Sequence, residues 1–168
     1  MMRYLLITCI FLCNLSGIAA AGPDKDQVLK MLEGRHWKLD IRGFNKLGED
    51  ADIILIEIAE NDSLMNVIRF RALEVLSLFP TDKTAAFLEV TAEKAFTPMA
   101  RRGFEAMKRS FAKTKPERVK RLATKLLKHR NSNIRISAAR YIRFVDQTLY
   151  KSFINTEKES WVRKAVQK

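Results

Sequence analysis

The sequence contains few side chains whose type and spacing could support catalysis. The two histidines, His36 and His129, could exchange protons near neutral pH, but they lie in opposite halves of the chain without a neighbouring carboxylate pattern. The acids Glu49, Asp50 and Asp52 cluster at an expected turn, where carboxylates commonly cap helices. The sequence has no Gly-rich phosphate loop and no His/Cys/Asp cluster at metal-ligand spacing. We therefore expect no enzyme activity, no cofactor and no metal site.

Charge is the stronger chemical signal. The net charge is +12, and it is unevenly divided along the chain. Residues 24–95 carry 10 basic and 14 acidic side chains, whereas residues 96–168 carry 20 basic and 5 acidic ones. A bias of this size predicts attraction of the C-terminal half to an anionic partner or surface.

One basic stripe falls on a single helix face. On the helix expected over residues 117–129, four basic side chains lie opposite the apolar stripe: Arg118, Arg121, Lys125 and Lys128. Such a stripe is either a binding surface or a solvated helix face that aids solubility. His129 ends the same helix, where a positive charge would favour the helix dipole.

The helices that must position these side chains contain a repeated sequence motif, called here the repeat phrase. In Ile134/Ala138/Ile142 an apolar, a small and an apolar residue are spaced by four, so all three share one helix face. The phrase begins again at Leu39, Ile68, Met99 and Val162. The steps between the five starts are 29, 31, 35 and 28 residues. This period predicts stacked two-helix units.

The helix boundaries follow from breaks and capping residues. Helices are expected over 27–32, 37–47, 51–59, 64–79, 84–95, 117–129, 147–155 and 159–167, with two more beginning at 97 and 134. Thr97 and Pro98 stand in the favoured cap-then-proline order. The four isoleucines within 51–59 are also compatible with a buried strand. We expect a helix there because no second strand candidate exists to pair with it.

The paired helices and two of the phrases resemble a known family. Ile68-Arg69-x-x-Ala72 and Ile134-Arg135-x-x-Ala138-Ala139 are similar to short HEAT repeats, of the type found in HEAT-like and bilin-lyase-type repeat proteins. The resemblance covers residues 24–168. It implies an all-α fold, a right-handed α-solenoid of about five stacked two-helix repeats. Arg69 and Arg135 are expected to be structural and to bond to neighbouring turns.

In this family the second helix of each pair lines the concave surface, so the resemblance implies a groove on that side. Its outward positions lie two, six and nine residues after each anchor: Phe70, Glu74 and Ser77, then Arg101, Glu105 and Lys108, then Ile136, Arg140 and Arg143. Exposed apolar and arginine side chains together are typical of a binding site. The expected partner-binding residues are Phe70, Glu74, Arg101, Lys108, Ile136, Arg140 and Arg143.

Residues 1–21 are expected to form a cleaved signal peptide, leaving a repeat domain over 22–168. Arg3 precedes an apolar run, and small residues ending at Ala21 give an Ala-x-Ala cleavage pattern. The alternative is an uncleaved anchor, but the run is short for a membrane span. Both cysteines, Cys9 and Cys13, lie in this segment, so the mature domain would contain no disulfide. We expect export, to the periplasm or medium of a bacterium.

The expected function is a non-catalytic scaffold that binds a protein partner with an acidic surface. The alternative is electrostatic binding of an anionic polymer or membrane surface, such as lipopolysaccharide, acidic lipid or nucleic acid, by the basic half. Export and the scarcity of stacking aromatics disfavour nucleic acid. Trp161, Val162 and Val166 on the last helix either pack inward on the preceding helix or form an open end for self-association.

Overall fold

The computed structural model describes residues 22–168, and this part of the chain is all-helical. The expected signal peptide and both cysteines lie outside the described residues. The helices are α1 (Lys25–Leu32), α2 (Ile41–Asn45), α3 (Ala51–Glu60), α4 (Asn66–Leu76), α5 (Asp82–Lys94), α6 (Thr97–Phe111), α7 (Pro116–Leu126), α8 (Ser132–Val145), α9 (Gln147–Thr156) and α10 (Ser160–Gln167).

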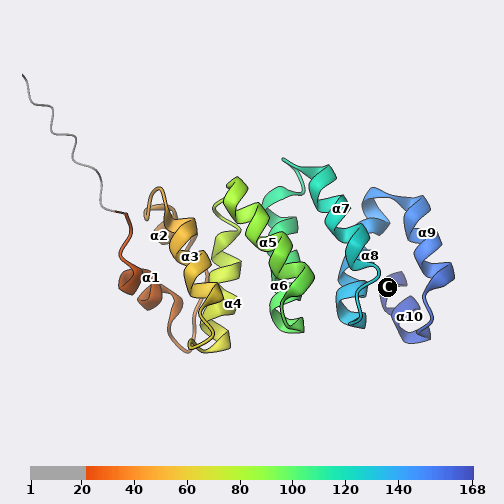
Figure 1. The fold of residues 1–168 in the computed structure, drawn as a ribbon, viewed down its shortest axis with the longest axis horizontal. Coiled ribbons are helices and arrows are strands. Elements are labelled where there is room, and N and C mark those ends of the chain that lie inside the picture. The colour runs from red at the N-terminus through yellow and green to blue at the C-terminus, as the bar shows by residue number, and fades with distance from the viewer. Residues whose placement is uncertain (1–21) are drawn as a thin grey trace, which may run out of the picture.

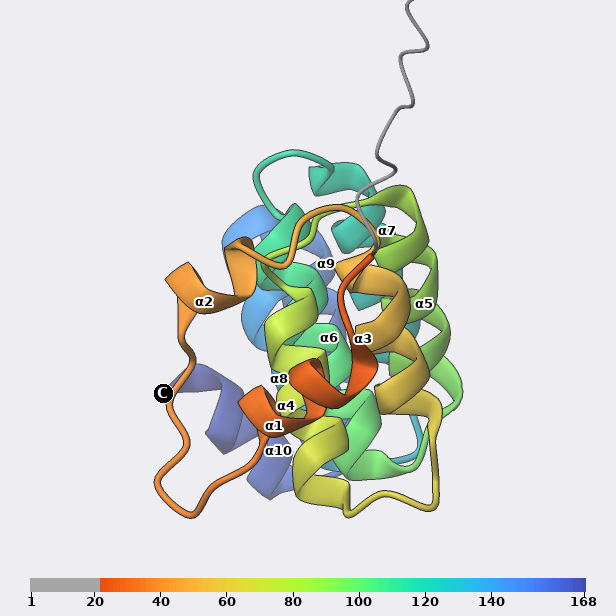
Figure 2. The same cartoon turned by 90° about the vertical axis from the view of Figure 1, so that its left-hand side faces the viewer.

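The helices from α3 to α8 pack in successive pairs, which follow one another along the long axis of the molecule, and α9 and α10 both pack on α8 (Figure 1). Helix α3 packs on α4, α5 on α6, and α7 on α8. The view along that axis shows α3 and α5 on one side of the molecule and α4, α6 and α8 on the other (Figure 2). Within the second row α4 contacts α6, α6 contacts α8, and α8 contacts α10. The second helices therefore form a continuous surface of their own.

The repeated phrase forms the core between the two rows. Ile134, Ala138 and Ile142 are fully buried, and the corresponding residues of α4 and α6 are buried as well. Leu39, Gly43 and Leu47, by contrast, are only partly buried. Val162 and Val166 are also fully buried, so the apolar side chains of α10 pack inward, with the exception of Trp161. One hydrophobic cluster runs from α1 to α10. None of the helices in the described part of the chain is both long and apolar enough to cross a bilayer.

Two local expectations are wrong. The helix expected over 37–47 is confined to α2, because Asp40 accepts a hydrogen bond from the Gly43 backbone N–H and starts the helix late. Before it, the Trp37 indole donates to the Met31 carbonyl oxygen at 2.9 Å, which ties the segment back to α1. Helix α6 begins at Thr97, but Phe96 and not Thr97 occupies the cap position. The helix over 51–59 is confirmed.

Helix α6 approaches α5 closely at Gly103, which gives a test of the packing. A Cβ atom at this position would lie 2.9 Å from Thr91 Cγ2 and 3.3 Å from the Ala92 backbone nitrogen. Thr91 is buried and β-branched, so it cannot turn aside. Although alanine has the higher helix propensity, we expect Gly103→Ala to lower the free energy of unfolding by about 1 kcal/mol, measured by urea denaturation.

The matched control for this substitution removes the obstructing methyl group. In a Thr91→Ala background, where Cγ2 is absent, Gly103→Ala is expected to cost less than in the natural chain, because only the 3.2 Å approach to the residue 91 Cβ and the 3.3 Å approach to the Ala92 nitrogen remain. A gain of stability for Gly103→Ala in the otherwise natural chain would mean that the α5–α6 contact is looser than described.

Candidate partner-binding site

The outward surface of α4, α6, α8 and α10, called here the second-helix face, is hollowed by two adjoining cavities. The smaller cavity, of about 100 Å³, lies between α4 and α6 and is lined by Phe70, Glu74, Arg102, Glu105, Ala106 and Arg109. The larger cavity, of about 510 Å³, is lined from α6, α8 and α10 by Arg101, Glu105, Lys108, Asn133, Ile136, Ser137, Arg140, Trp161 and Ala165. Glu105 borders both.

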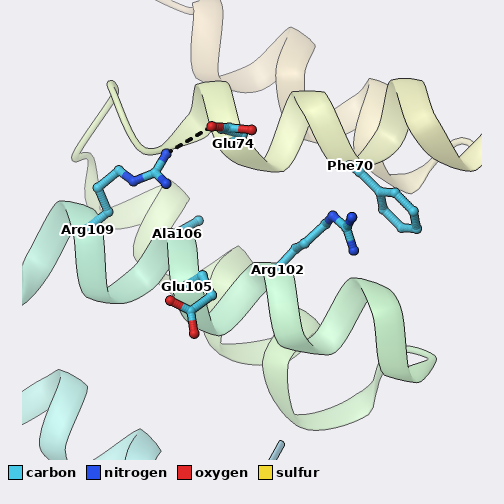
Figure 3. Close-up of a pocket in the computed structure, with 6 residues that line it drawn as sticks. All are labelled: Phe70, Glu74, Arg102, Glu105, Ala106 and Arg109. Carbon is cyan, nitrogen blue, oxygen red and sulfur yellow. Dashed lines mark hydrogen bonds and ion pairs between the residues drawn. The ribbon is translucent and has the colours of Figure 1, made fainter. Parts of the chain in front are cut away.

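The smaller cavity combines an aromatic wall with balanced charges (Figure 3). The Arg102 guanidinium carbon lies 3.9 Å from the centre of the Phe70 ring, within the range of a cation–π contact. Arg109 Nη1 lies 3.3 Å from Glu74 Oε1 and links α6 to α4. The Phe70 ring also lies 6.4 Å, centroid to centroid, from the Phe96 ring. The cavity therefore presents flat apolar surface beside charges that already have partners.

The larger cavity is cationic and is organised around Glu105. Lys108 Nζ lies 2.7 Å from Glu105 Oε2, and the Ser137 hydroxyl donates to Glu105 Oε1. Burial raises the pKa of the Glu105 carboxyl, but hydrogen bonds from Lys108 and Ser137 outweigh that effect and leave the pKa below its usual value. The carboxylate is thus charged at neutral pH. Three cationic side chains against this one carboxylate leave the cavity net positive.

Helix α10 closes the larger cavity with an exposed aromatic ring. Trp161 is 49% exposed, and its indole N–H donates to Glu159 Oε2 at 2.7 Å. Arg140 Nη2 donates to the Ala165 carbonyl oxygen at 2.9 Å, which connects α8 to the same helix. An exposed tryptophan beside arginine is the pair of residue types most enriched in binding hot spots.

The structure brings most of the expected partner-binding residues together around these cavities. Phe70 and Glu74 line the smaller one, whereas Arg101, Lys108, Ile136 and Arg140 line the larger one. The expectation that Ile136 is an exposed anchor is wrong, since its side chain is only 8% exposed. Ser77 is buried as well. Ile136 lies on α8, which α6 and α10 flank on both sides, so this position is covered.

Arg143 lies outside the two cavities and has a structural role. Its Nη1 donates to the carbonyl oxygens of Val166 and Gln167, both at 3.2 Å. The Tyr150 hydroxyl also donates to the Val166 carbonyl oxygen, at 3.3 Å. These donors satisfy carbonyl groups that the last turn of a helix leaves unpaired. The structure therefore does not place Arg143 with the other expected partner-binding residues.

Half of the expected basic face on α7 is neutralised by ion pairs. Arg118 makes a bidentate pair with Glu89, at 2.8 and 2.9 Å, and Lys125 lies 2.9 Å from Glu93. The hydrogen bond from Arg118 lowers the pKa of the Glu89 carboxyl. Arg121 and Lys128 are exposed and have no ion pair within residues 22–168. Because α5 supplies acids opposite α7, two of the four basic side chains connect these helices and the other two present free charge.

The two arginines of the repeat phrase are structural, as expected. Arg69 Nε donates to the Ala59 carbonyl oxygen at 3.0 Å. Arg135 donates to the His129 carbonyl oxygen at 2.9 Å and pairs with Glu157 at 2.7 Å and Glu159 at 2.5 Å. This cluster joins the α7–α8 turn to the α9–α10 turn.

The two histidines and the acids of the expected turn lie apart from the two cavities. No group of three or more His, Cys, Asp or Glu side chains among residues 22–168 could hold a metal ion. Desolvation lowers the pKa of His129, whose Nδ1 accepts the Asn131 backbone N–H at 3.0 Å. The lowered pKa disfavours the cation, and α7 ends at Leu126, so the expectation that His129 ends this helix is wrong. The Asp52 carboxylate caps no helix and accepts the Thr81 hydroxyl at 2.5 Å.

Several cavity residues were missed by the sequence argument. Arg102, Ala106 and Arg109 lie three, seven and ten residues after the Met99 anchor, on the stripe of α6 beside the one considered. The outward surface of a helix is wide enough to include both stripes. Trp161 was considered only as part of the terminal packing. No protein-family model, curated protein or solved structure matches the chain.

Proposed function

We propose that this chain is an exported, non-catalytic scaffold, a right-handed α-solenoid of HEAT-like repeats that binds a protein partner through its second-helix face. The observation that carries the proposal is the pair of adjoining cavities over α4, α6, α8 and α10. Aromatic and arginine side chains line both cavities, and these residue types dominate the binding energy of protein interfaces.

The arrangement of this face supports protein binding because several of its side chains are already fixed. Glu105 is held by Lys108 and Ser137, and Arg102 stacks on Phe70. Side chains ordered in advance lose less conformational entropy when a partner binds. The net positive charge of the larger cavity favours a partner with an acidic surface.

Binding of an anionic polymer or membrane surface by the basic half is the alternative. The ion pairs of Arg118 and Lys125 weigh against it, because they remove two free charges from the basic face of α7. A polyanion complex would also weaken log-linearly with salt, whereas a partly apolar protein interface would retain affinity.

Capture of the partner tests the proposal and separates these alternatives. The full chain with a C-terminal affinity tag is incubated with envelope extract and washed at about 0.05 and about 0.5 M salt, which bracket weak and strong screening. We expect a discrete protein to be retained at high salt. Arg101→Glu should reduce that retention, since Arg101 is exposed in the larger cavity.

Arg121→Glu is the matched control for the capture experiment. It makes the same charge change at an exposed position of α7, on the other row of helices. Retention should be unaffected by this variant. Equal loss for both variants, or release of everything at high salt, would contradict binding at the second-helix face.

A further inference from the structure

We propose that the segment bound by the second-helix face is an extended acidic stretch of the partner, with one apolar side chain in the smaller cavity and a carboxylate about three residues away in the larger one. This inference rests on the proposed function and adds the chemistry and spacing of the ligand. It follows from the different charge of the two cavities and from the distance between them.

The smaller cavity suits an apolar side chain. With Glu105 assigned to its partner Lys108 in the larger cavity, the smaller cavity holds Arg102, Arg109 and Glu74 and is only weakly cationic. Arg109 is engaged by Glu74, and the Arg102 guanidinium carbon lies 3.9 Å from the centre of the Phe70 ring. A methyl-bearing side chain placed against Ala106 and the aliphatic part of Arg102 would bury apolar surface without displacing an ion pair (Figure 3).

The larger cavity suits a carboxylate. Arg101 has no ion pair within the described residues, and Arg140 uses one N–H group on the Ala165 carbonyl oxygen and keeps the others. Both side chains are exposed. Arginine binds carboxylates through paired, charge-assisted hydrogen bonds. Lys108 is committed to Glu105, so these two arginines are the donors available to a ligand.

The spacing of the cavities sets the spacing of the ligand groups. One cavity lies between α4 and α6, and the other begins between α6 and α8, so they are separated by about one helix-to-helix distance, roughly 10 Å. In a polyproline II conformation, residues three apart point the same way and are about 9 Å apart. Acidic stretches adopt such extended conformations because their charges repel one another.

Synthetic peptides test this inference directly. The reference is a capped, fluorescein-labelled Gly/Ser peptide with a leucine and, three residues on, a pair of aspartates. Three comparison peptides replace the aspartates by asparagine, replace the leucine by glycine, or place the aspartates next to the leucine. Binding to the full chain is followed by fluorescence anisotropy at about 0.15 M salt, near physiological screening.

The reference peptide is expected to bind at least about tenfold more tightly than each comparison peptide. Arg101→Glu should weaken the aspartate peptide about tenfold and leave the asparagine peptide unchanged, whereas Arg121→Glu should alter neither. Phe70→Ala should weaken the leucine peptide and leave the glycine peptide unchanged. These cycles assign each ligand group to one cavity.

The inference is overturned if the aspartate and asparagine peptides bind equally, or if the reference peptide shows no binding at about 1 mM. If, in that case, the tagged chain still retains a protein in an Arg101-dependent manner, the scaffold proposal stands and only the acidic segment is lost. If the peptides behave as expected while partner retention ignores Arg101→Glu, the proposed scaffold function fails instead.

Discussion

Replacement of Arg135 by methionine is expected to lower the free energy of unfolding by about 3 kcal/mol, the largest effect of any single substitution of a charged residue proposed for this chain. The Arg135 side chain is 12% exposed and that of Glu157 only 5%. Removal of one partner of a buried ion pair leaves the other charge desolvated and uncompensated. Methionine retains the length of the side chain, so the change isolates the charge and its hydrogen bonds. Chemical denaturation measures the difference.

Arg69→Met is the matched control for Arg135→Met. Arg69 occupies the same position of the repeat phrase, but it donates to the Ala59 carbonyl oxygen and pairs with no carboxylate in the described chain. Its loss is expected to cost about 1 kcal/mol. An equal loss of unfolding free energy in the two variants would show that Glu157 and Glu159 contribute nothing to stability. Glu157→Gln added to Arg135→Met should recover part of the lost stability, because it removes the stranded charge.

The stability difference between the natural chain and Arg135→Met should depend on pH. The hydrogen bond from Arg135 lowers the pKa of Glu157 and also that of Glu159, from a usual value of 4.5. Their contribution is therefore complete above about pH 4.5 and is lost as the pH falls towards their lowered values. In the variant, burial without a partner favours the protonated form of Glu157. The difference should thus be largest at neutral pH and shrink under acidic conditions.

The repeat period predicts the order of the helices but not which outward side chains are exposed. Spacings of four placed Ile134, Ala138 and Ile142 in the core correctly, because any helix packed on a partner buries such a stripe. Ile136 was placed outward by the same rule, although neighbours on both sides cover it. A helix period gives an angle around one axis, whereas exposure depends on the number of flanking helices. Helix α2 is shorter than expected for a related reason. Trp37 and Asp40 make hydrogen bonds, to the Met31 carbonyl oxygen and from the Gly43 backbone N–H, that the helix period does not predict.

The ion pairs between repeats had a signal in the sequence that the charge argument did not use. Arg118 and Glu89 are separated by 29 residues, and Lys125 and Glu93 by 32, which are steps of one repeat. Glu105 and Ser137 are also separated by 32. In a stacked array, residues one period apart occupy equivalent positions on adjacent units. Opposite charges at that separation therefore predict pairing, and the excess of basic residues after residue 96 overstates the charge that remains free.

Reversal of both arginines that hold α10, Arg140→Glu with Arg143→Glu, is expected to detach this helix from α8. Together they donate to three carbonyl oxygens in its last turn. The double reversal removes these bonds and places carboxylates beside the negative end of the helix dipole. Together these changes should lower the local free energy of unfolding of α10 by about 2 kcal/mol. Terminal elements have little stability to spare. Amide hydrogen exchange should therefore accelerate over residues 160–167 while α4 and α6 remain protected.

This expectation changes what the double reversal can reveal about binding. The sequence alone places both arginines among the partner contacts, so that loss of binding with helicity intact would assign them to the interface. Because Trp161 stands on the helix they hold, its detachment would open the larger cavity and weaken binding indirectly. Arg101→Glu alters the same cavity from α6 without a bond to α10, and its exchange pattern should match that of the natural chain. Unchanged exchange in α10 of the double variant would show that these arginines are free to contact a partner.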